Sequence, residues 1–197
     1  MTDPAPASPK PPSKILSILK KVLIGFVAIL AIFALVVALQ PPDFAIARTA
    51  AMAAPSAAAF AQVNDFHKWE AWSPWAKIDP AMKTTYEGPS SGTGAVYSWA
   101  GNDQVGEGRM TILESRPGEL VKIKLEFLKP FAATNQADFA FKGDGSQTSV
   151  TWSMSGRKNF IQKAFCMFMD MDKMVGGDFE KGLASLKRLA EPVPATR

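Results

Sequence analysis

A serine flanked by glycines is the first candidate for chemistry in this sequence. Residues 88–92, GPSSG, match the G-x-S-x-G pattern of a nucleophile elbow. An elbow needs a strand before the serine, a helix after it and a histidine downstream. Here Gly94 leads into another strand-like run, and the sole histidine, His67, lies upstream. The motif therefore predicts a flexible hairpin turn rather than a nucleophile.

The sole histidine and the sole cysteine limit acid–base and metal chemistry. As a general base, His67 would need an orienting partner such as Asp65 or Glu70 and access to a cavity; the alternative is a solvent-exposed helix residue. With Cys166 alone, the chain has no intrachain disulfide and no cysteine-rich metal site. G-x-G-x-x-G, Walker and C-x-x-C motifs are absent. The sequence thus predicts no catalytic residue, no metal site and no cofactor.

Charged side chains on predicted strands are candidates for holding the polar head of a ligand. Four fall on the polar side of their strands, where a surface position is the default: Glu107, Arg109, Glu126 and Asp138. A β-bulge can turn such a residue inward. We select Arg109 as the candidate, because a guanidinium binds carboxylates and phosphates with two parallel hydrogen bonds.

Aromatic and methionine side chains are the remaining candidates, either as a packed core or as the lining of an apolar cavity. Two features favour a cavity: the methionines near the C-terminus are adaptable, and Trp and Tyr carry a polar atom that a ligand or water could meet. The predicted ligand-binding set is Tyr97, Trp99, Met110, Ile112, Phe127, Phe139, Trp152, Met154, Met167, Phe168 and Met171, with Arg109 for a polar head.

A period of two predicts the strands that would position this set. In Leu120–Leu128 apolar residues alternate with charged ones, which is typical of an antiparallel strand with one wet face. Turn residues separate six such runs: Lys83–Glu87, Gly94–Trp99, Gly106–Ser115, Leu120–Leu128, Thr134–Lys142 and Gln147–Ser155. Asp43–Ala51 is a further predicted strand, with Phe44, Ile46 and Arg48 on one side. A curved meander would gather the apolar set on its concave side.

Helical spacing predicts amphipathic helices on either side of these strands in the chain. Pro55–Trp69 is the first, followed by a short helix around Trp75–Ile78. Arg157–Ala190 carries apolar residues at intervals of three and four and is long enough to cover the sheet. Gly176 and Gly177 interrupt this stripe, and we expect a kink there.

An apolar run near the N-terminus predicts a membrane anchor. Val22–Leu39 holds 18 uncharged residues, about 27 Å as a helix, which matches the hydrocarbon thickness of a bilayer. A cleaved signal peptide is the alternative, but the run is too long and lacks a small-residue cleavage site at its end. Four lysines and one aspartate before Val22 give a local charge of +3. The positive-inside rule then predicts a single-pass protein of the cell inner membrane, with a cytoplasmic N-terminus and a periplasmic C-terminal domain.

The predicted organisation is a proline-rich, disordered cytoplasmic tail over residues 1–21, a transmembrane helix over 22–39, one domain over 43–191 and a tail over 192–197. From residue 22 onward, 18 basic and 17 acidic residues nearly cancel. A nucleic-acid partner, which needs a basic stripe, is therefore disfavoured, and the sequence names no protein partner.

Several phrases resemble the START-related, polyketide cyclase/dehydrase-like (SRPBCC) family. They are WSPW at 72–75, GAVYSW at 94–99, GEGRMTI at 106–112, FLKPF at 127–131, TWSM at 151–154 and DFEKGL at 178–183. The order of strand, helix pair, six strands and long helix is similar too, over about residues 43–191. The resemblance implies an α+β helix-grip fold, a curved antiparallel sheet of about seven strands wrapped on a long C-terminal helix. It also implies a hydrophobic small molecule or lipid as ligand.

Three functions fit this sequence. We favour a membrane-anchored binding module for a lipid or other hydrophobic small molecule. The alternatives are a cyclase or dehydratase-like enzyme acting on a hydrophobic substrate and an envelope interaction protein with no ligand. Polar groups with shifted pKa values inside a cavity would favour the enzyme, and a filled interior with an exposed apolar patch would favour the interaction protein.

Overall fold

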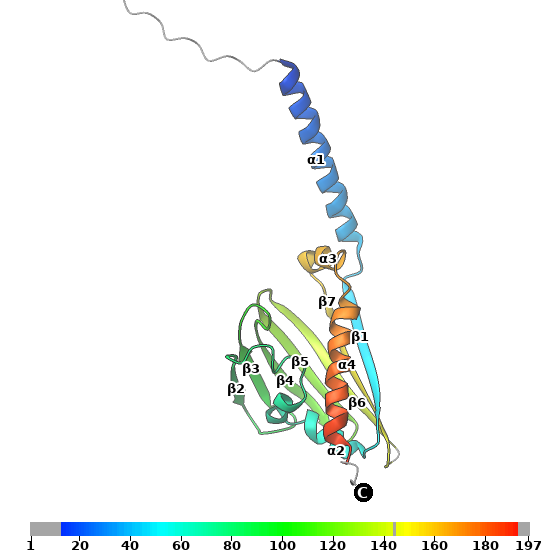
Figure 1. Ribbon diagram of the computed structural model, residues 1–197. Coiled ribbons are helices and arrows are strands. Elements are labelled where there is room, and N and C mark those ends of the chain that lie inside the picture. The colour runs from blue at the N-terminus through cyan, green and yellow to red at the C-terminus, as the bar shows by residue number, and fades with distance from the viewer. Residues whose placement is uncertain (1–12, 144, 193–197) are drawn as a thin grey trace, which may run out of the picture. The chain divides into compact units, whose positions relative to one another are not determined.

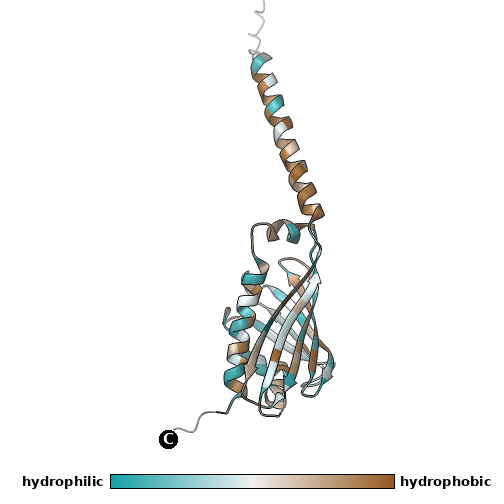
Figure 2. Ribbon diagram, turned by 90° about the vertical axis from the view of Figure 1, so that its right-hand side faces the viewer, coloured by the Kyte–Doolittle hydropathy of each residue, from teal (hydrophilic) through white to brown (hydrophobic). Residues whose placement is uncertain are grey.

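The computed structural model describes residues 13–143 and 145–192, and the chain divides into two units at Pro41 and Pro42 (Figure 1). The first unit contains α1, Ser13–Leu39. This helix is long and apolar enough to cross a membrane, as its colouring in Figure 2 shows, and its length and composition also fit a signal sequence.

The helix α1 begins before the predicted span. Residues 13–21, which we assigned to the disordered tail, are helical, because the prolines end at Pro12 and helix-forming Leu, Ile and Lys follow. The predicted tails over residues 1–12 and 193–197 lie outside the described residues.

The second unit is an α+β domain built on one curved, seven-stranded antiparallel sheet. Its strands are β1 (Asp43–Met52), β2 (Lys83–Glu87), β3 (Val96–Ala100), β4 (Glu107–Arg116), β5 (Leu120–Lys129), β6 (Ala133–Gly143) and β7 (Thr148–Arg157). They lie in the order β1-β7-β6-β5-β4-β3-β2. Each predicted strand is present, with its ends within two residues of the prediction. The alternation of apolar and polar residues marks the two faces of a strand, and the turn residues mark its ends.

Two short helices follow β1 in place of the single predicted one. These are α2 (Ser56–Val63) and the 3-10 helix η1 (Phe66–Ala71). The Asp65 side chain accepts a hydrogen bond from the backbone N–H of His67, so it caps a new turn and ends the continuous helix. Residues 75–78 form turns rather than the predicted short helix.

The C-terminal segment also forms two helices, α3 (Phe160–Cys166) and α4 (Met171–Ala190), where we predicted one. The side chains of Asn159 and Asp170 each accept a backbone N–H at a helix start. Two N-caps so close in sequence start two separate helices. The break therefore falls between Cys166 and Met171, and α4 alone crosses the concave face of the sheet (Figure 1).

The predicted kink at Gly176 and Gly177 is wrong, because α4 runs through both residues. A Cβ atom at Gly176 would overlap the guanidinium of Arg48, which reaches across the helix from β1. Glycine at this position therefore leaves room for the Arg48 side chain and does not bend the helix.

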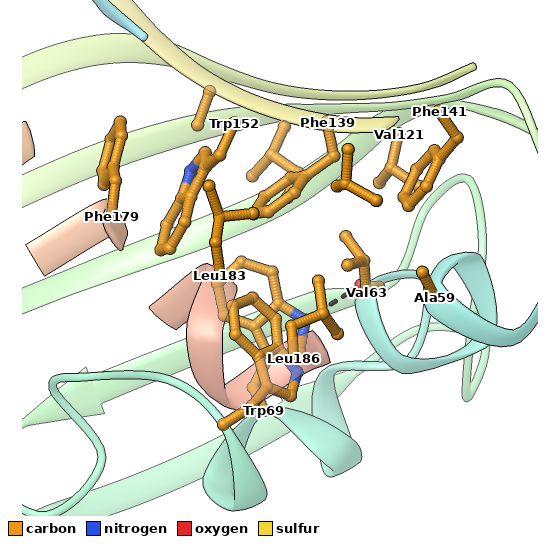
Figure 3. Packing of buried hydrophobic residues seen from close by; sticks show 14 of the residues in the cluster. Ala59, Val63, Trp69, Val121, Phe139, Phe141, Trp152, Phe179, Leu183 and Leu186 are labelled. Carbon is orange, nitrogen blue, oxygen red and sulfur yellow. Dashed lines mark hydrogen bonds between the residues drawn. The ribbon is translucent and has the colours of Figure 1, made fainter. Parts of the chain in front are cut away.

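A hydrophobic core lies between the sheet and the helices α2, η1 and α4. Trp152 of β7 stacks between Phe139 and Phe179, with ring-centroid distances of 4.8 and 4.1 Å. Figure 3 shows Leu183 of α4 near this stack, and the Nε1–H of Trp69 donating to a backbone carbonyl of α2. Figure 1 places α2 at one end of the sheet and α3 at the other.

Candidate ligand-binding site

The predicted ligand-binding set divides between three parts of the domain. Five members belong to the buried core and are at most 9% exposed: Met110, Ile112, Phe139, Trp152 and Met154. Rings from η1 and α4 pack directly on Phe139 and Trp152. These five residues therefore pack in the hydrophobic core, and the two hollows described below have other residues in their lining.

Three further members are half-buried on β3 and β5: Tyr97, Trp99 and Phe127. Trp99 Nε1 donates to Val105 O at 3.0 Å, so its polar atom is already bonded to the backbone. Burial raises the pKa of Tyr97 to about 12, with smaller effects from Tyr86 and Glu70. The Tyr97 phenol is thus neutral at physiological pH.

The last three members, Met167, Phe168 and Met171, line an open hollow of about 580 Å³. The start of β1, from Phe44 to Ile46, and residues 166–172 provide its walls. This volume falls within the range of about 300–1,000 Å³ that is typical of small-molecule pockets. The helix break between α3 and α4 creates the hollow, because residues 167–170 leave the helical path there.

The lining of this hollow suits an amphiphilic molecule. Its methionine side chains are flexible and polarisable, and Cys166 Sγ lies 3.2 Å from Met171 Sδ. Lys158 is the one basic residue of the lining, and it makes no ion pair with any residue that the structure describes. Asp170, by contrast, already caps α4.

Arg48 ties β1 to α4 beside the hollow. Its Nη2 lies 2.8 Å from Asp172 Oδ2, and its Nε lies 2.8 Å from Glu180 Oε1. The hydrogen bond from Arg48 is the main cause that lowers the pKa of Asp172, and the same contacts raise the pKa of Arg48. Arg48 lies in its predicted strand, but no role was predicted for it. The available signal was a charged residue on the apolar side of that strand, in line with Phe44 and Ile46.

Arg109, the predicted head-group residue, lies on the outer face of the sheet. Its side chain is 44% exposed and pairs with Glu87 at 3.5 Å. The register shifts of β4 fall between residues 107 and 108 and between 112 and 114, so no bulge turns Arg109 inward. Glu126 stays on the same face, 2.6 Å from Lys124 Nζ, and Asp138 alternates with inward-facing neighbours of β6.

A second, smaller hollow of about 280 Å³ has His67 and Ser90 in its lining. His67 Nδ1 lies 3.0 Å from Asp65 Oδ1, which is the orienting partner that a general base needs. No hydrogen bond within the described part of the chain reaches the Ser90 hydroxyl. Residues 88–92 form the turn between β2 and β3, with Gly88 at a φ of 76°, and this confirms the predicted hairpin turn.

A curved seven-stranded antiparallel sheet that holds a C-terminal helix on its concave face defines the helix-grip class of proteins. Within that class, the sequence family described as polyketide cyclase / dehydrase and lipid transport matches residues 43–191. The chain belongs to this family, as the resemblance of its motifs predicted. No curated protein sequence matches the chain.

Solved structures share the fold at low sequence identity. CV1439 from Chromobacterium violaceum is 13% identical, over 78% of this chain and 100% of that one, with a TM-score of 0.53. The Aha1 dimer from Colwellia psychrerythraea is 14% identical, over 75% and 96%, with a TM-score of 0.54. The di-domain ARO/CYC StfQ from the steffimycin biosynthetic pathway is 12% identical, over 76% and 51%, with a TM-score of 0.55. At such identities the likeness shows the fold alone.

Proposed function

We propose that this protein is a membrane-tethered binding module for a lipid or another hydrophobic small molecule. The ligand lies in the hollow between β1 and residues 166–172, not in the core. The observation that carries this proposal is the open hollow of about 580 Å³ with methionines in its lining. The family description, which includes lipid transport, supports it.

The chemistry of the hollow suggests how the ligand is held. An apolar chain would lie against Ile46 and Met171, where the methionine adapts to different shapes. An anionic head group would lie near the Lys158 ammonium. Arg48 takes part indirectly, because its ion pairs hold the start of α4 against β1.

The tether in this proposal is an uncleaved transmembrane segment over residues 22–39 of α1, followed by a periplasmic domain over 43–191. Only Gln40 to Pro42 separates the end of α1 from the start of β1. The intact mass of the membrane-extracted protein should include residues 2–40, and a mature N-terminus between residues 40 and 55 would overturn the tether. A periplasm-dependent reporter fused after Arg197 should be active.

Mass spectrometry of molecules that co-purify with the detergent-extracted full-length protein tests the ligand site. Met171→Trp should fill the hollow, because Met171 lies in its lining. The amount of co-purified molecule should then fall at least tenfold. Met174→Trp is the matched control, since this exposed residue of α4 is outside the lining and should keep the ligand. Equal loss of the co-purified molecule in both variants, or no loss in either, would contradict the placement of the ligand site in the hollow.

A second candidate function is an interaction protein without a ligand. It is favoured by the close packing of aromatic rings in the core together with exposed aromatic residues on α3. Absence of any co-purified molecule from the unaltered protein would support it. A change in mass of the bound molecule during incubation would instead support the cyclase or dehydratase-like enzyme of the family description.

A further inference from the structure

Exposed apolar side chains gather at one end of the domain. Within the described residues 42–143 and 145–192, eight of the thirteen large hydrophobic residues that are exposed belong to α3, the segment after it, the end of β5 and the β5–β6 turn. They are Leu128, Phe131, Phe160, Ile161, Phe165, Met167, Phe168 and Met169, with exposed fractions from 40% to 79%. We call these eight residues the apolar end. Their number sets it apart from scattered surface hydrophobics, which need no explanation.

Two segments far apart in the sequence form this surface together. Phe131 follows β5 and Phe165 belongs to α3, and their ring centroids lie 6.3 Å apart. The helix α3 contains no buried residue, although Phe160, Ile161 and Phe165 would ordinarily supply a core. The apolar end is therefore one surface that the fold itself leaves uncovered.

The chain enters the domain at this same end. The backbone N–H of Lys158, two residues before α3, donates to Pro42 O at 2.8 Å. Pro42 is three residues after Leu39, the last residue of α1. Three residues span at most about 11 Å when extended. If α1 spans the bilayer, the start of α3 therefore lies close to the bilayer surface whatever angle the domain adopts.

The charged residues around the apolar end are also suited to contact with the bilayer surface. Arg157, Lys158 and Lys163 lie beside or between its aromatic residues in sequence. Basic residues next to Phe, Ile and Leu are typical of segments that lie in the interface of a membrane. The nearby carboxylates are paired, Asp43 with Arg157, Asp170 with Lys173 and Asp172 with Arg48, and so add little repulsion from anionic lipid.

We propose that the apolar end inserts into the headgroup region of the leaflet from which α1 emerges, and that its occupant is the phospholipid bilayer. The insertion rests on the proposed tether. Because Met167, Phe168 and Met169 belong both to the apolar end and to the lining of the hollow, insertion opens the hollow toward the lipid. A lipid can then enter the hollow from the leaflet without crossing water.

The full-length protein in vesicles of phosphatidylcholine and phosphatidylglycerol tests this insertion. In a Cys166→Ser background, an NBD fluorophore is attached at Phe165→Cys or at Ile161→Cys, two exposed positions whose exchange leaves the core intact. Ser90→Cys, in the turn between β2 and β3, is the control. Lipids with brominated acyl chains should quench the probes at 161 and 165, and aqueous iodide should quench them several-fold less than the probe at 90.

Two outcomes would overturn the insertion. Equal iodide quenching at all three positions would show that the apolar end lies in water. Protection from iodide without quenching by brominated lipid would show that a second copy or another protein covers it. Failure of the proposed function is seen separately: protein that lacks residues 2–40 by intact mass refutes the tether, whereas lipid quenching without any co-purified ligand refutes only the ligand site.

Discussion

The two ends of the domain carry similar side chains in opposite environments. At the end covered by α2 and η1, Trp69 and Trp72 are at most 6% exposed, whereas Phe160, Phe165 and Phe168 at the apolar end are at least 51% exposed. The difference lies in the covering element. The helices α2 and η1 bury apolar residues against the sheet, whereas the seven-residue α3 contains no buried residue. Apolar residues at the first end stabilise the fold, and in our proposal those at the second contact lipid.

The largest expected effect comes from replacing one buried aromatic residue with alanine, and the comparison is an alanine substitution at the apolar end. Trp152→Ala should lower the free energy of unfolding by about 3–5 kcal/mol, because the indole is 3% exposed and stacks on Phe139 and Phe179. Ile161→Ala should change it by about 0.5 kcal/mol or less, since Ile161 is 50% exposed and α3 contains no buried residue. Urea unfolding of the full-length protein in detergent, followed by circular dichroism, measures both. A cost below about 1 kcal/mol for Trp152→Ala would mark it as a cavity wall instead.

The strands were predictable from the sequence because their signal is local. In β5, apolar and charged residues alternate and turn residues lie at both ends, so neither face nor boundary depends on distant parts of the chain. The helices were less predictable, because hydrophobic spacing alone did not separate α3 from α4. The local signals for the break are the polar residues Asn159 and Asp170, which cap the two helices, and not the glycines of α4.

The candidate site was predictable only in part. Periodicity assigned Trp152 and Met171 to one apolar set, but whether such a residue meets a packed ring or an open hollow depends on what lies opposite. The role of Arg48 depends on the register between β1 and β7 and on the path of α4, which place its guanidinium over Gly176. No spacing within one segment of sequence encodes such a long-range contact.

The neighbouring glycines of α4 give a test of intermediate size. Gly177→Ala should raise the free energy of unfolding by about 0.5–1 kcal/mol, because a Cβ atom there meets nothing within 4 Å and alanine favours the helix. Gly176→Ala should lose this gain or reverse it, since its Cβ atom would displace the Arg48 guanidinium. Thermal unfolding of the two variants measures the effect of the same substitution at two neighbouring positions of α4. Equal stabilisation by both would show that Arg48 does not need its place over Gly176.

The ion pair of Arg48 with Asp172 gives the smallest expected effect, because the Asp172 side chain is 61% exposed and solvent screens the pair. The pKa of Asp172 is lowered in the folded protein, chiefly by the hydrogen bond from Arg48, so the ionised carboxylate favours the folded state. Its contribution is complete above the ordinary pKa of 3.8 and is lost as the pH falls through the lowered value. Asp172→Asn should therefore lower the melting temperature slightly at pH 7 and leave it unchanged in strong acid.

The control for this last effect is the same substitution in an Arg48→Ala background. There Asp172→Asn should have no pH-dependent effect, because the carboxylate has lost the guanidinium that lowers its pKa. A pH dependence that persists without Arg48 would assign the effect of Asp172 to the N-terminus of α4, where an acidic residue is favourable in itself. A pH dependence that disappears with Arg48 would show that the pair joins β1 to α4 beside the hollow. The link between β1 and α4 would then weaken in acid, and the folded core would not depend on it.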